Sequence, residues 1–512
     1  MKNISTSVSY LKDILSHERS HDWSESSLCY GHFSVIHPGH LRYFQTARKH
    51  ANRLLVAIES DESLSQIHQG DWYPELERAR AVAALEIVDH VIILDNRGLE
   101  GIVKQIRPKT LVLGREFEDT RSNEVSDAVL QVLEYGGEVY FEAGEPQYAS
   151  TDFLFGRQDD LERDRWMRFQ TVLKDNGINL KNSLDRITNY PSPKLLVVGD
   201  TILDKYVACD SVGMSNEAPV VVVKELETRE FIGGASIVAA HVVSLGAECV
   251  YLSVVGDDDE ADLVEKKLVE SGVTNHLVRD NSRPTTNKIR YMVDNQKLFR
   301  VSRLKEHSLS RAVEEIIIEK IVELVPSLQG IVISDFVYGV ITPNILSVIT
   351  ELSKEHNVPV FDDLQYSSQI GNVSKFKEFM LLCPTEREAR VAMANQDDSV
   401  EFVANLLIEK TRSHNLILKL GGEGLIAYAQ DSNSDFIHRH YYPALVSNPV
   451  DVAGAGDSML AAVAVSLTQG LSLFEAAALG SCVSAIAVQT VGNIPVEISD
   501  LKHFISRMEN AY

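Results

Sequence analysis

Two stretches of the chain alternate short apolar runs with longer amphipathic segments, and each stretch predicts a parallel α/β domain. In the first, the β-rich runs LLVAIES, HVIILD, TLVLG and EVYFEA are separated by helical patterns such as LRYFQTARKHA and ELERARAVAALEIV. This rhythm is typical of βαβ units, in which a helix connects neighbouring parallel strands. We predict a compact α/β domain over residues 28–156.

A second series of apolar strands begins with LLVVGD and continues through ECVYLSVVG, GIVISD, VPVFDD and LILKLG. It predicts another α/β domain over residues 194–512, so that the fold class is two doubly wound parallel-sheet domains. The segments VVVVKELETREF and NKIRYMVDNQKLFRVSRL have strand-like composition outside this rhythm. They predict antiparallel ribbons beside the second sheet.

Two other segments do not follow the strand and helix alternation. Residues 1–27 predict a short polar helical extension, with Leu11, Ile14 and Leu15 on one face. Residues 157–190 are highly charged with sparse apolar positions, and Pro-Ser-Pro follows. We predict a helical linker over residues 157–193 that ends at the prolines.

Composition narrows the class of protein. The 512 residues are 44% hydrophobic and 24% charged, which is ordinary for a soluble globular protein. With 73 acidic and 49 basic residues the net charge is -24, so nucleic acid is not an expected partner. Five cysteines without a C-x-x-C pair argue against zinc or disulfides, and no apolar run is long enough to cross a bilayer. We expect a cytoplasmic protein with no membrane role.

A His-Pro-Gly-His sequence follows the first strand of the predicted first domain and begins a helix. The N-terminus of a helix favours anions, so His37 and His40 would both face a triphosphate there. They would stabilise the charge that builds on the α-phosphate when an acceptor phosphate attacks it. Taken alone, the same residues are equally explained as two surface histidines in a turn.

The His-Pro-Gly-His sequence is part of a series of motifs in one order: Gly31-x-Phe33-x-x-x-His37-x-Gly39-His40, Ala47-Arg48-Lys49, Ala84-Leu85-Glu86-x-Val88-Asp89, Ile106-Arg107-Pro108 and Ser150-Thr151. With these motifs the segment resembles the cytidylyltransferase-like nucleotidyltransferases, and most closely those of the bifunctional heptose-phosphate kinase and adenylyltransferase type. The resemblance implies a site for ATP or CTP in which His37 and His40 hold the triphosphate and Arg48 contacts phosphate. Three cations usual in that family are replaced by Gln69, Tyr73 and Leu113. Arg115 is a candidate replacement for one of these cations. The resemblance assigns the binding of nucleotide and phosphate to Gly31, Phe33, His37, His40, Arg48, Arg115, Ser150 and Thr151.

Near the C-terminus, Gly454-Ala455-Gly456-Asp457 precedes an apolar helix. Small residues let the backbone approach a phosphate closely, and the helix end supplies unpaired N–H groups for the charge on a transferred phosphoryl group. Asp457 would take the proton of an attacking hydroxyl. On its own the tetrapeptide is equally explained as a tight strand-to-helix turn in which Asp457 caps the helix.

Residues 194 to about 505 resemble the ribokinase-like carbohydrate kinases. The motifs are Val198-Gly199-Asp200, Gly233-Gly234-Ala235, Arg283-Pro284-Thr285-Thr286-x-Lys288-x-Arg290 and the Gly454 to Asp457 loop. The resemblance implies that Asp457 is the base, that Glu388 organises Mg²⁺ indirectly, and that Gly421 and Gly424 lie by ATP. It places Asp204, Gly233, Gly234 and Lys288 at the sugar site, and makes the β-ribbons a lid that doubles as a homodimer interface.

Departures from the kinase pattern cluster on the substrate side. The Asn that follows Gly-Gly-Ala-x in the family is Ile237, the Asn of its Asn-x-x-Glu is Thr385, and its Asp-Pro-Lys reads Asp363-Leu364-Gln365. The phosphoryl-transfer loop itself is intact. We therefore expect kinase chemistry with a changed ligand, in which Ser236 is the neighbouring polar side chain that could replace the missing amide.

A hydroxyl kinase and a nucleotidyltransferase in one chain predict a bifunctional enzyme. It would make a sugar phosphate and activate it with an NTP as a nucleotide sugar, heptose-like, for cell-surface polysaccharide. The nucleotidyltransferase comes first, the reverse of the order in the bifunctional type that it resembles. Two other functions stay open: only the kinase half turns over, or the chain is a nucleotide-binding scaffold or sensor in which neither half does.

Overall fold

The chain folds into two compact units, formed by residues 1–159 with 395–405 and by residues 160–394 with 406–512. The computed structural model describes residues 8–16, 23–34, 36, 38–67, 73–114, 117, 123–142, 158–189, 191–215, 217–218, 220–293, 296–365, 373–430 and 437–511. The predicted sites at Gln69, Arg115, Ser150, Thr151 and His37 lie outside these residues.

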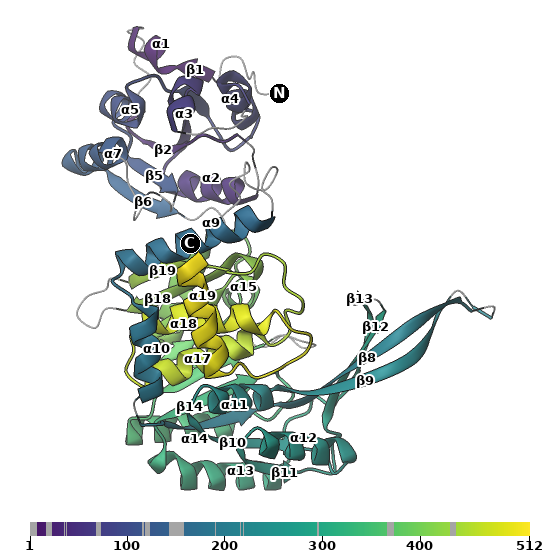
Figure 1. The fold of residues 1–512 in the computed structure, drawn as a ribbon. Helices are drawn as coiled ribbons and strands as arrows, with labels where there is room; N and C mark the ends of the chain where they lie inside the picture. Colours follow the sequence, from purple (N-terminus) through teal and green to yellow (C-terminus); the bar gives the residue numbers. More distant parts are fainter. Residues whose placement is uncertain are drawn as a thin grey trace. The chain divides into compact units, whose positions relative to one another are not determined.

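The first unit contains a six-stranded parallel sheet in the order β1-β4-β3-β2-β5-β6 (Figure 1). From β2 the chain moves to β3 and β4 on one side, and then to β5 and β6 on the other. This reversal between β2 and β5 opens a crevice at the carboxyl ends of the strands, where α/β sheets bind ligands. The strands are β1 Val8–Tyr10, β2 Ser26–Gly31, β3 Arg53–Ile58, β4 His90–Ile93, β5 Thr110–Gly114 and β6 Glu138–Glu142.

Helices cover both faces of this sheet, which explains why its strands are continuously apolar. Leu28 and Leu111 belong to one hydrophobic cluster, and their neighbours Cys29 and Val112 belong to the other. Successive side chains therefore point to opposite faces, as the strand period requires. The helices are α2 Pro38–His50, α3 Asp61–Ile67, α4 Glu75–Ala83, α5 Gly98–Ile106 and α7 Asn123–Glu134.

The N-terminal segment is part of this unit, whereas the sequence suggested a simple polar extension. Its strand β1 pairs in parallel with β4, with Val8 opposite Val91. Leu11, at the start of α1 (Leu11–Ser16), is fully buried in the cluster that contains Leu28. The pairing lengthens the sheet by one edge strand, a tertiary contact that the short apolar run did not reveal.

The second unit is built on a nine-stranded sheet in the order β11-β10-β7-β14-β15-β16-β17-β18-β19. It is parallel from β11 to β17 and antiparallel across β17, β18 and β19. The chain reverses direction across the sheet between β7 and β14, so this fold is also doubly wound, as predicted. The strands are β7 Lys194–Gly199, β10 Glu248–Val255, β11 Thr274–Arg279, β14 Gly330–Asp335, β15 Val360–Leu364, β16 Leu381–Leu382, β17 Asn415–Lys419, β18 Gly424–Gln430 and β19 Ile437–Pro443.

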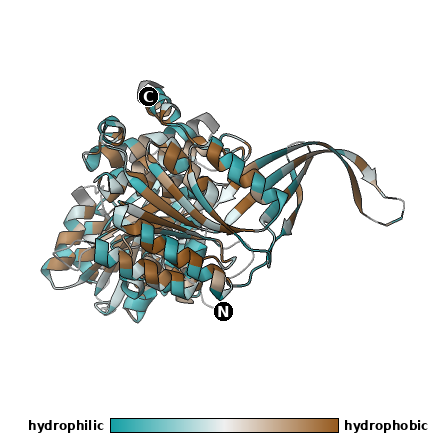
Figure 2. Cartoon of the chain, turned by 90° about the horizontal axis from the view of Figure 1, so that it is seen from below, coloured by the Kyte–Doolittle hydropathy of each residue, from teal (hydrophilic) through white to brown (hydrophobic). Residues whose placement is uncertain are grey.

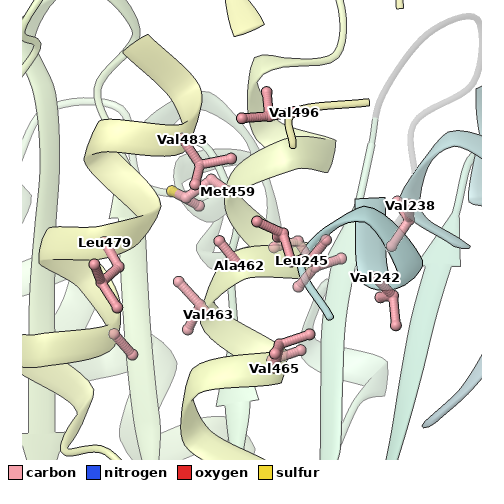
Figure 3. Close-up of a cluster of buried hydrophobic side chains, with 14 of the residues drawn as sticks. Val238, Val242, Leu245, Met459, Ala462, Val463, Val465, Leu479, Val483 and Val496 are labelled. Atoms are coloured by element: carbon pink, nitrogen blue, oxygen red, sulfur yellow. The ribbon is translucent and has the colours of Figure 1, made fainter. Parts of the chain in front are cut away.

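Three closely packed helices, α11, α17 and α18, form the centre of the hydrophobic core of this unit. Figure 3 shows Val242 of α11, Val463 of α17 and Leu479 of α18 among the side chains that meet there. The helices are α9 Gln158–Asp175, α10 Leu180–Asn189, α11 Ala235–Ser244, α12 Asp259–Glu270, α13 Arg311–Leu324, α14 Pro343–His356, α15 Glu386–Met393, α16 Val400–Thr411, α17 Ala455–Thr468, α18 Leu473–Ala487 and α19 Ile498–Ala511.

The segment predicted as a linker is helical, but it packs into this core. Trp166 and Phe169 of α9 and Leu184 of α10 are buried in the same cluster as α17 and α18. Some of the charged neighbours also anchor the helix, because Arg165 donates to the carbonyls of Ala444 and Val446 and Glu162 accepts from Ser447. The apolar positions are therefore sparse in the sequence although the helices are well anchored. The second compact unit therefore includes α9 and α10, ahead of the domain boundary predicted at residue 194.

A four-stranded sheet in the order β13-β12-β8-β9 extends from this unit. Strands β8 and β9 form a long antiparallel ribbon that projects from the body of the unit, and Figure 2 shows hydrophobic stretches along it. Because β12 pairs with β8 in parallel, the two predicted ribbons join into one mixed sheet. The strands are β8 Thr201–Met214, β9 Val221–Gly234, β12 Thr286–Val293 and β13 Gln296–Arg303.

Candidate active site

The Gly454 to Asp457 loop forms the beginning of α17. Gly454 is the N-cap residue with φ of 78°, a left-handed conformation that favours glycine, and the helix starts at Ala455. Asp457 lies inside the first turn, only 5% exposed, and its Oδ1 accepts a 2.7 Å hydrogen bond from Gln365 Nε2. The interpretation of Asp457 as the helix cap is therefore excluded.

The surroundings of Asp457 give it the protonation behaviour of a base that works near neutral pH. Burial and, to a smaller degree, the negative charge of Asp363 raise its pKa to about 7. Lys419 and the hydrogen bond from Gln365 act in the opposite direction, and Asp204 is near enough to raise the pKa slightly. A carboxyl group with a pKa near the working pH is suited to accept a proton in catalysis.

Lys419 brings a cation to the same loop from the end of β17. Its Nζ lies 2.6 Å from Asp363 Oδ1 and 2.7 Å from Asp363 Oδ2, and Asp363 is completely buried. A Cβ built on Gly456 would lie 3.2 Å from the same ammonium nitrogen. Lys419 was not among the predicted site residues, because a single Lys at the end of the apolar strand LILKLG carries no motif.

The predicted sugar residues Asp204, Gly233 and Gly234 come together where β8 and β9 meet. Arg290 forms an ion pair with Asp204 Oδ1, and Asn493 Nδ2 donates to Asp204 Oδ2 at 3.0 Å. A Cβ on Gly233 would lie 2.2 Å from Asp204 Oδ2, so glycine is required for the carboxylate to occupy this position. Asn493 is a further residue that the sequence motifs did not identify.

Lys288, on β12 opposite Asp204 on β8, is buried against aromatic rings. Its Nζ lies 5.0 Å from the ring centroid of Phe336 and 5.4 Å from that of Tyr338. The backbone N–H groups of these two aromatic residues donate to buried Asp200, which fixes the loop that carries them. Within the described parts of the chain, Lys288 forms no ion pair, so its charge is available to a ligand.

Neither residue in the position of the missing amide offers a polar group to a ligand. Ile237 is completely buried in the main hydrophobic cluster. Ser236 is also completely buried, and its hydroxyl donates to the carbonyl of Gly233 at 2.6 Å. The polar replacement for the family's Asn must therefore come from another element.

On the nucleotide side, Thr385 and Glu388 form a capping box at the start of α15. Thr385 Oγ1 accepts from the Glu388 N–H at 3.2 Å, and Glu388 Oε2 accepts from the Thr385 N–H at 2.7 Å. Gly421 and Gly424 flank the turn between β17 and β18, with φ of 63° and 111°. Across the described ranges there is no group of three or more His, Cys, Asp or Glu that could hold a metal ion directly.

In the first unit, Gly31, Phe33 and His40 come together at the carboxyl end of β2. The Phe33 and His40 rings meet edge to face with centroids 5.0 Å apart, and a Cβ on Gly31 would lie 3.1 Å from the Phe33 ring. His40 lies in the first turn of α2, so this cluster occupies the crevice where the sheet reverses direction.

Arg48 lies at the other end of α2 and forms an ion pair with Asp89, which also accepts from the Leu54 N–H. The structure therefore does not bring Arg48 together with His40. Leu113 and Tyr73 stand where the family usually has cations, but neither side chain carries a positive charge. Leu113 is fully buried in β5 and Tyr73 is 63% exposed.

Comparison with known proteins identifies both units. The model of the pfkB family of carbohydrate kinases matches residues 192–499, and the cytidylyltransferase-like model matches residues 28–152. The order predicted from the sequence, with the nucleotidyltransferase-type domain first, is thereby confirmed. No helix in the described part of the chain is both long and apolar enough to cross a membrane.

Two curated relatives illustrate the similarity, and both are bifunctional proteins HldE. The protein from Campylobacter jejuni subsp. doylei is 30% identical over 315 residues, which cover 61% of this chain and 64% of the relative. The protein from Trichlorobacter lovleyi is 31% identical over 312 residues, which cover 60% of this chain and 62% of the relative. The chain thus matches less than two thirds of the length of each.

Solved structures support the fold of the second unit. Phosphofructokinase-2 from Escherichia coli in complex with potassium is 15% identical with a TM-score of 0.52, covering 62% of this chain and 100% of that protein. The same enzyme with substrates and products gives a TM-score of 0.51 at 15% identity over the same shares. By the match to residues 192–499, this chain belongs to the pfkB family of carbohydrate kinases.

Proposed function

We propose that the second unit transfers the γ-phosphoryl group of ATP to a hydroxyl of a sugar or sugar phosphate. The observation that carries this proposal is the buried carboxyl of Asp457, with a pKa raised to about 7, in the first turn of α17. A base in this position lies next to N–H groups that have no partner within the helix and attract anions.

In the proposed reaction, Asp457 accepts the proton of the attacking hydroxyl while the hydroxyl oxygen forms a bond to the γ-phosphorus. The bond between this phosphorus and the oxygen that bridges it to the β-phosphate breaks, and ADP leaves. The N–H groups at the start of α17 and the ammonium of Lys419 stabilise the negative charge on the transferred group. Gln365 orients Asp457 through its 2.7 Å hydrogen bond.

The substrate side fits a sugar phosphate. Asp204 is a hydrogen-bond acceptor held by Arg290, and it is close enough to Asp457 to affect its pKa. We assign the binding of the sugar hydroxyls to Asp204 and the binding of its phosphate to Lys288, which lies against two aromatic rings and forms no ion pair with any residue that the structure describes.

Mg²⁺ fits this site in an indirect role. Asp363 already contacts Lys419, and Glu388 caps α15, so neither is free to be one of several direct protein ligands. Mg²⁺ is often held by one or two carboxylates together with waters and substrate phosphates. Glu388, together with Asp363, would hold it indirectly, through the waters of the ion, and when bound it would supply neutralising charge at the ATP phosphates.

For the first unit, we propose transfer of a nucleotidyl group from ATP or CTP to a sugar 1-phosphate, with release of pyrophosphate. The match to the cytidylyltransferase-like model and the placement of Gly31, Phe33 and His40 in the sheet crevice support it. Together the two reactions would produce a heptose-like nucleotide sugar. The pairing of Arg48 with Asp89 and the burial of Leu113 favour, as second candidate, a unit that binds nucleotide without turnover.

We also propose that the lid forms a homodimer interface and that the protein works in the cytoplasm. All five cysteines are buried and free, which suits a reducing compartment. Apolar side chains are unusually exposed on the lid, which suits a partner surface. They are Val212, Met214, Val220, Val221, Leu226, Leu298, Phe299 and Val301. Light scattering tests this: the intact protein should have twice the mass of one chain, and Leu226→Glu should reduce it.

The test of function is a panel of sugars, sugar phosphates and sugar 1-phosphates, including D-glycero-D-manno-heptose 7-phosphate, with ATP or CTP and Mg²⁺. Sugar-dependent ADP formation supports the kinase, and pyrophosphate release with a sugar 1-phosphate supports the nucleotidyltransferase. ADP without pyrophosphate would leave only the kinase active. Neither product with any panel member would overturn both reactions in favour of a binding protein.

A further inference from the structure

Asn493 lies in the loop between α18 and α19, next to both the sugar residues and the phosphoryl-transfer loop. It is 8% exposed, and its Nδ2 donates to Asp204 Oδ2 at 3.0 Å. Its Oδ1 is buried and has no hydrogen-bond partner among the described residues. A Cβ on Gly454 would lie 2.5 Å from this oxygen, so Oδ1 sits directly against the loop that begins α17.

The orientation of the Asn493 amide is fixed by its neighbour. An ionised carboxylate can only accept hydrogen bonds, so the NH₂ group must be the one that faces Asp204. Arg290 pairs with the other carboxylate oxygen and holds Asp204 in place. The amide oxygen is therefore directed away from Asp204, and the two groups of the amide cannot be exchanged without placing two acceptors against each other.

A buried carbonyl oxygen without a donor is unfavourable in a folded protein, and such groups call for an explanation. Ser236 and Ile237, at the position where a substrate-binding amide is missing, offer no polar group. The amide oxygen of Asn493 lies against Gly454 at the start of α17, while its NH₂ group contacts Asp204, which the sequence assigns to the sugar site. The oxygen needs a donor, and a hydroxyl group of a substrate held by Asp204 would supply one.

We propose that Asn493 is a substrate-specificity residue whose Oδ1 accepts a hydrogen bond from one sugar hydroxyl while Asp204 accepts from its neighbour. Two adjacent acceptors select a sugar with two neighbouring hydroxyl groups. This inference rests on the proposed kinase function of the second unit, and it identifies two neighbouring hydroxyl groups as the part of the substrate that Asn493 and Asp204 recognise.

The test combines substitutions of Asn493 with substrate analogues that lack one hydroxyl, and compares their separate and joint effects on kcat/KM. The probe is the panel sugar with the highest kcat/KM, together with its analogues that each lack one hydroxyl. For the intact protein, two deoxy analogues should each lose about tenfold in kcat/KM, as expected for lost hydrogen bonds. In Asn493→Ala, kcat/KM for the parent sugar should fall about tenfold, one of those two penalties should disappear, and the KM for ATP should not change.

Asn415→Ala is a matched control, because Asn415 also donates from a partly buried amide, to Met380 O at 2.9 Å, but lies at the opposite end of β17 from Lys419. It should leave both deoxy penalties in place. Asn493→Ser, tested in parallel, serves if the alanine variant does not fold. Unchanged deoxy penalties in a folded, active Asn493 variant would overturn the role of Asn493, whereas an intact protein without sugar-dependent ADP formation would overturn the kinase itself.

Discussion

At the residue level, the proposed phosphoryl-transfer site depends on how Asp363, Lys419 and Asp457 share one buried space. Lys419 neutralises Asp363, and without this cation both carboxyl groups would hold their protons more tightly. In related kinases the tract at 363–365 carries its own Lys, whereas here Gln365 contacts Asp457 as a neutral donor. The positive charge is supplied instead by β17, so the chemistry can survive a departure within its own motif.

The first prediction concerns the base. Asp457→Asn should reduce sugar-dependent ADP formation by about 10² to 10⁴, because it removes the proton acceptor and preserves the shape. Asp259→Asn, which changes an exposed acid in the first turn of α12, is the control and should have normal activity. Near-normal phosphorylation by the Asp457 variant would show that another group accepts the proton.

The second prediction concerns pH. Because the pKa of folded Asp457 is raised from 3.8 to about 7, the native state holds this proton more tightly than the unfolded chain does. Its contribution to stability is fully present below about pH 4 and is lost as pH rises through about 7. The kinase kcat/KM should instead rise as pH increases through about 7, because Asp457 then loses its proton and can act as the base.

Thermal unfolding between pH 4 and 8 checks the stability part of this prediction. The midpoint of Asp457→Asn should exceed that of the intact protein at pH 8, and the difference should shrink toward pH 4. A constant difference across this range would contradict the raised pKa.

Some residues of the site could be identified from the sequence because they belong to motifs, and others could not. Asp457, Gly454 and Gly233 belong to short motifs in which small residues have a local geometric reason. Asn493 and Lys419 are single polar residues, and only the meeting of distant strands and loops brings them to the site. A pattern of neighbours in sequence cannot reveal contacts such as that between Asn493 and Asp204, which are 289 positions apart.

At the level of elements, regular apolar runs predicted the central strands of both sheets, including β3, β5 and β7, but not the edge strand β1. Pairing was harder: the parallel contact of β12 with β8 depends on segments far apart in the chain. The charged helix α9 was misjudged as a linker because its buried face consists of a few large residues. Trp166, Phe169 and Leu173 follow the helical spacing, but abundant acidic and basic neighbours obscure it.

The third prediction follows from that buried face. Trp166→Ala should lower the free energy of unfolding of the second unit by about 3 to 5 kcal/mol, since it empties a large buried volume. Met167→Ala, at the adjacent and 48% exposed position, should change it little. Denaturation by urea, followed through kinase activity and circular dichroism, measures both. Equal effects would indicate that α9 is only loosely attached.

A fourth prediction concerns the lid. Lys297 of β13 lies 2.8 Å from Asp451, just before the phosphoryl-transfer loop, and Tyr206 of β8 donates to the same carboxylate at 2.7 Å. Because Lys297 is half exposed, Lys297→Met should raise the KM for the sugar only about threefold. Lys224→Met on β9 is the control, because this exposed residue forms no ion pair within the described part of the chain. An unchanged KM would mean that this ion pair does not hold the lid.

At the level of the whole molecule, the chain joins two α/β units that each have their own sheet, core and crevice. Each sheet reverses direction once. In the first unit Gly31, Phe33 and His40 gather at the carboxyl end of β2, whereas Arg48 lies at the other end of α2. Nothing in either site borrows a described residue from the other unit. The two proposed reactions should therefore be separable by single substitutions.

The fifth prediction tests this separation. His40→Ala should lower pyrophosphate release by roughly 10² or more, because a preorganised donor to the transition-state phosphate is lost, and should leave ADP formation unchanged. His50→Ala, at the other end of the same helix, where its ring stacks on Tyr140, is the control and should retain both activities. Asp457→Asn should give the converse result. If His40→Ala also impaired the kinase, the units would be coupled; if the intact protein released no pyrophosphate, the first unit would act by binding alone.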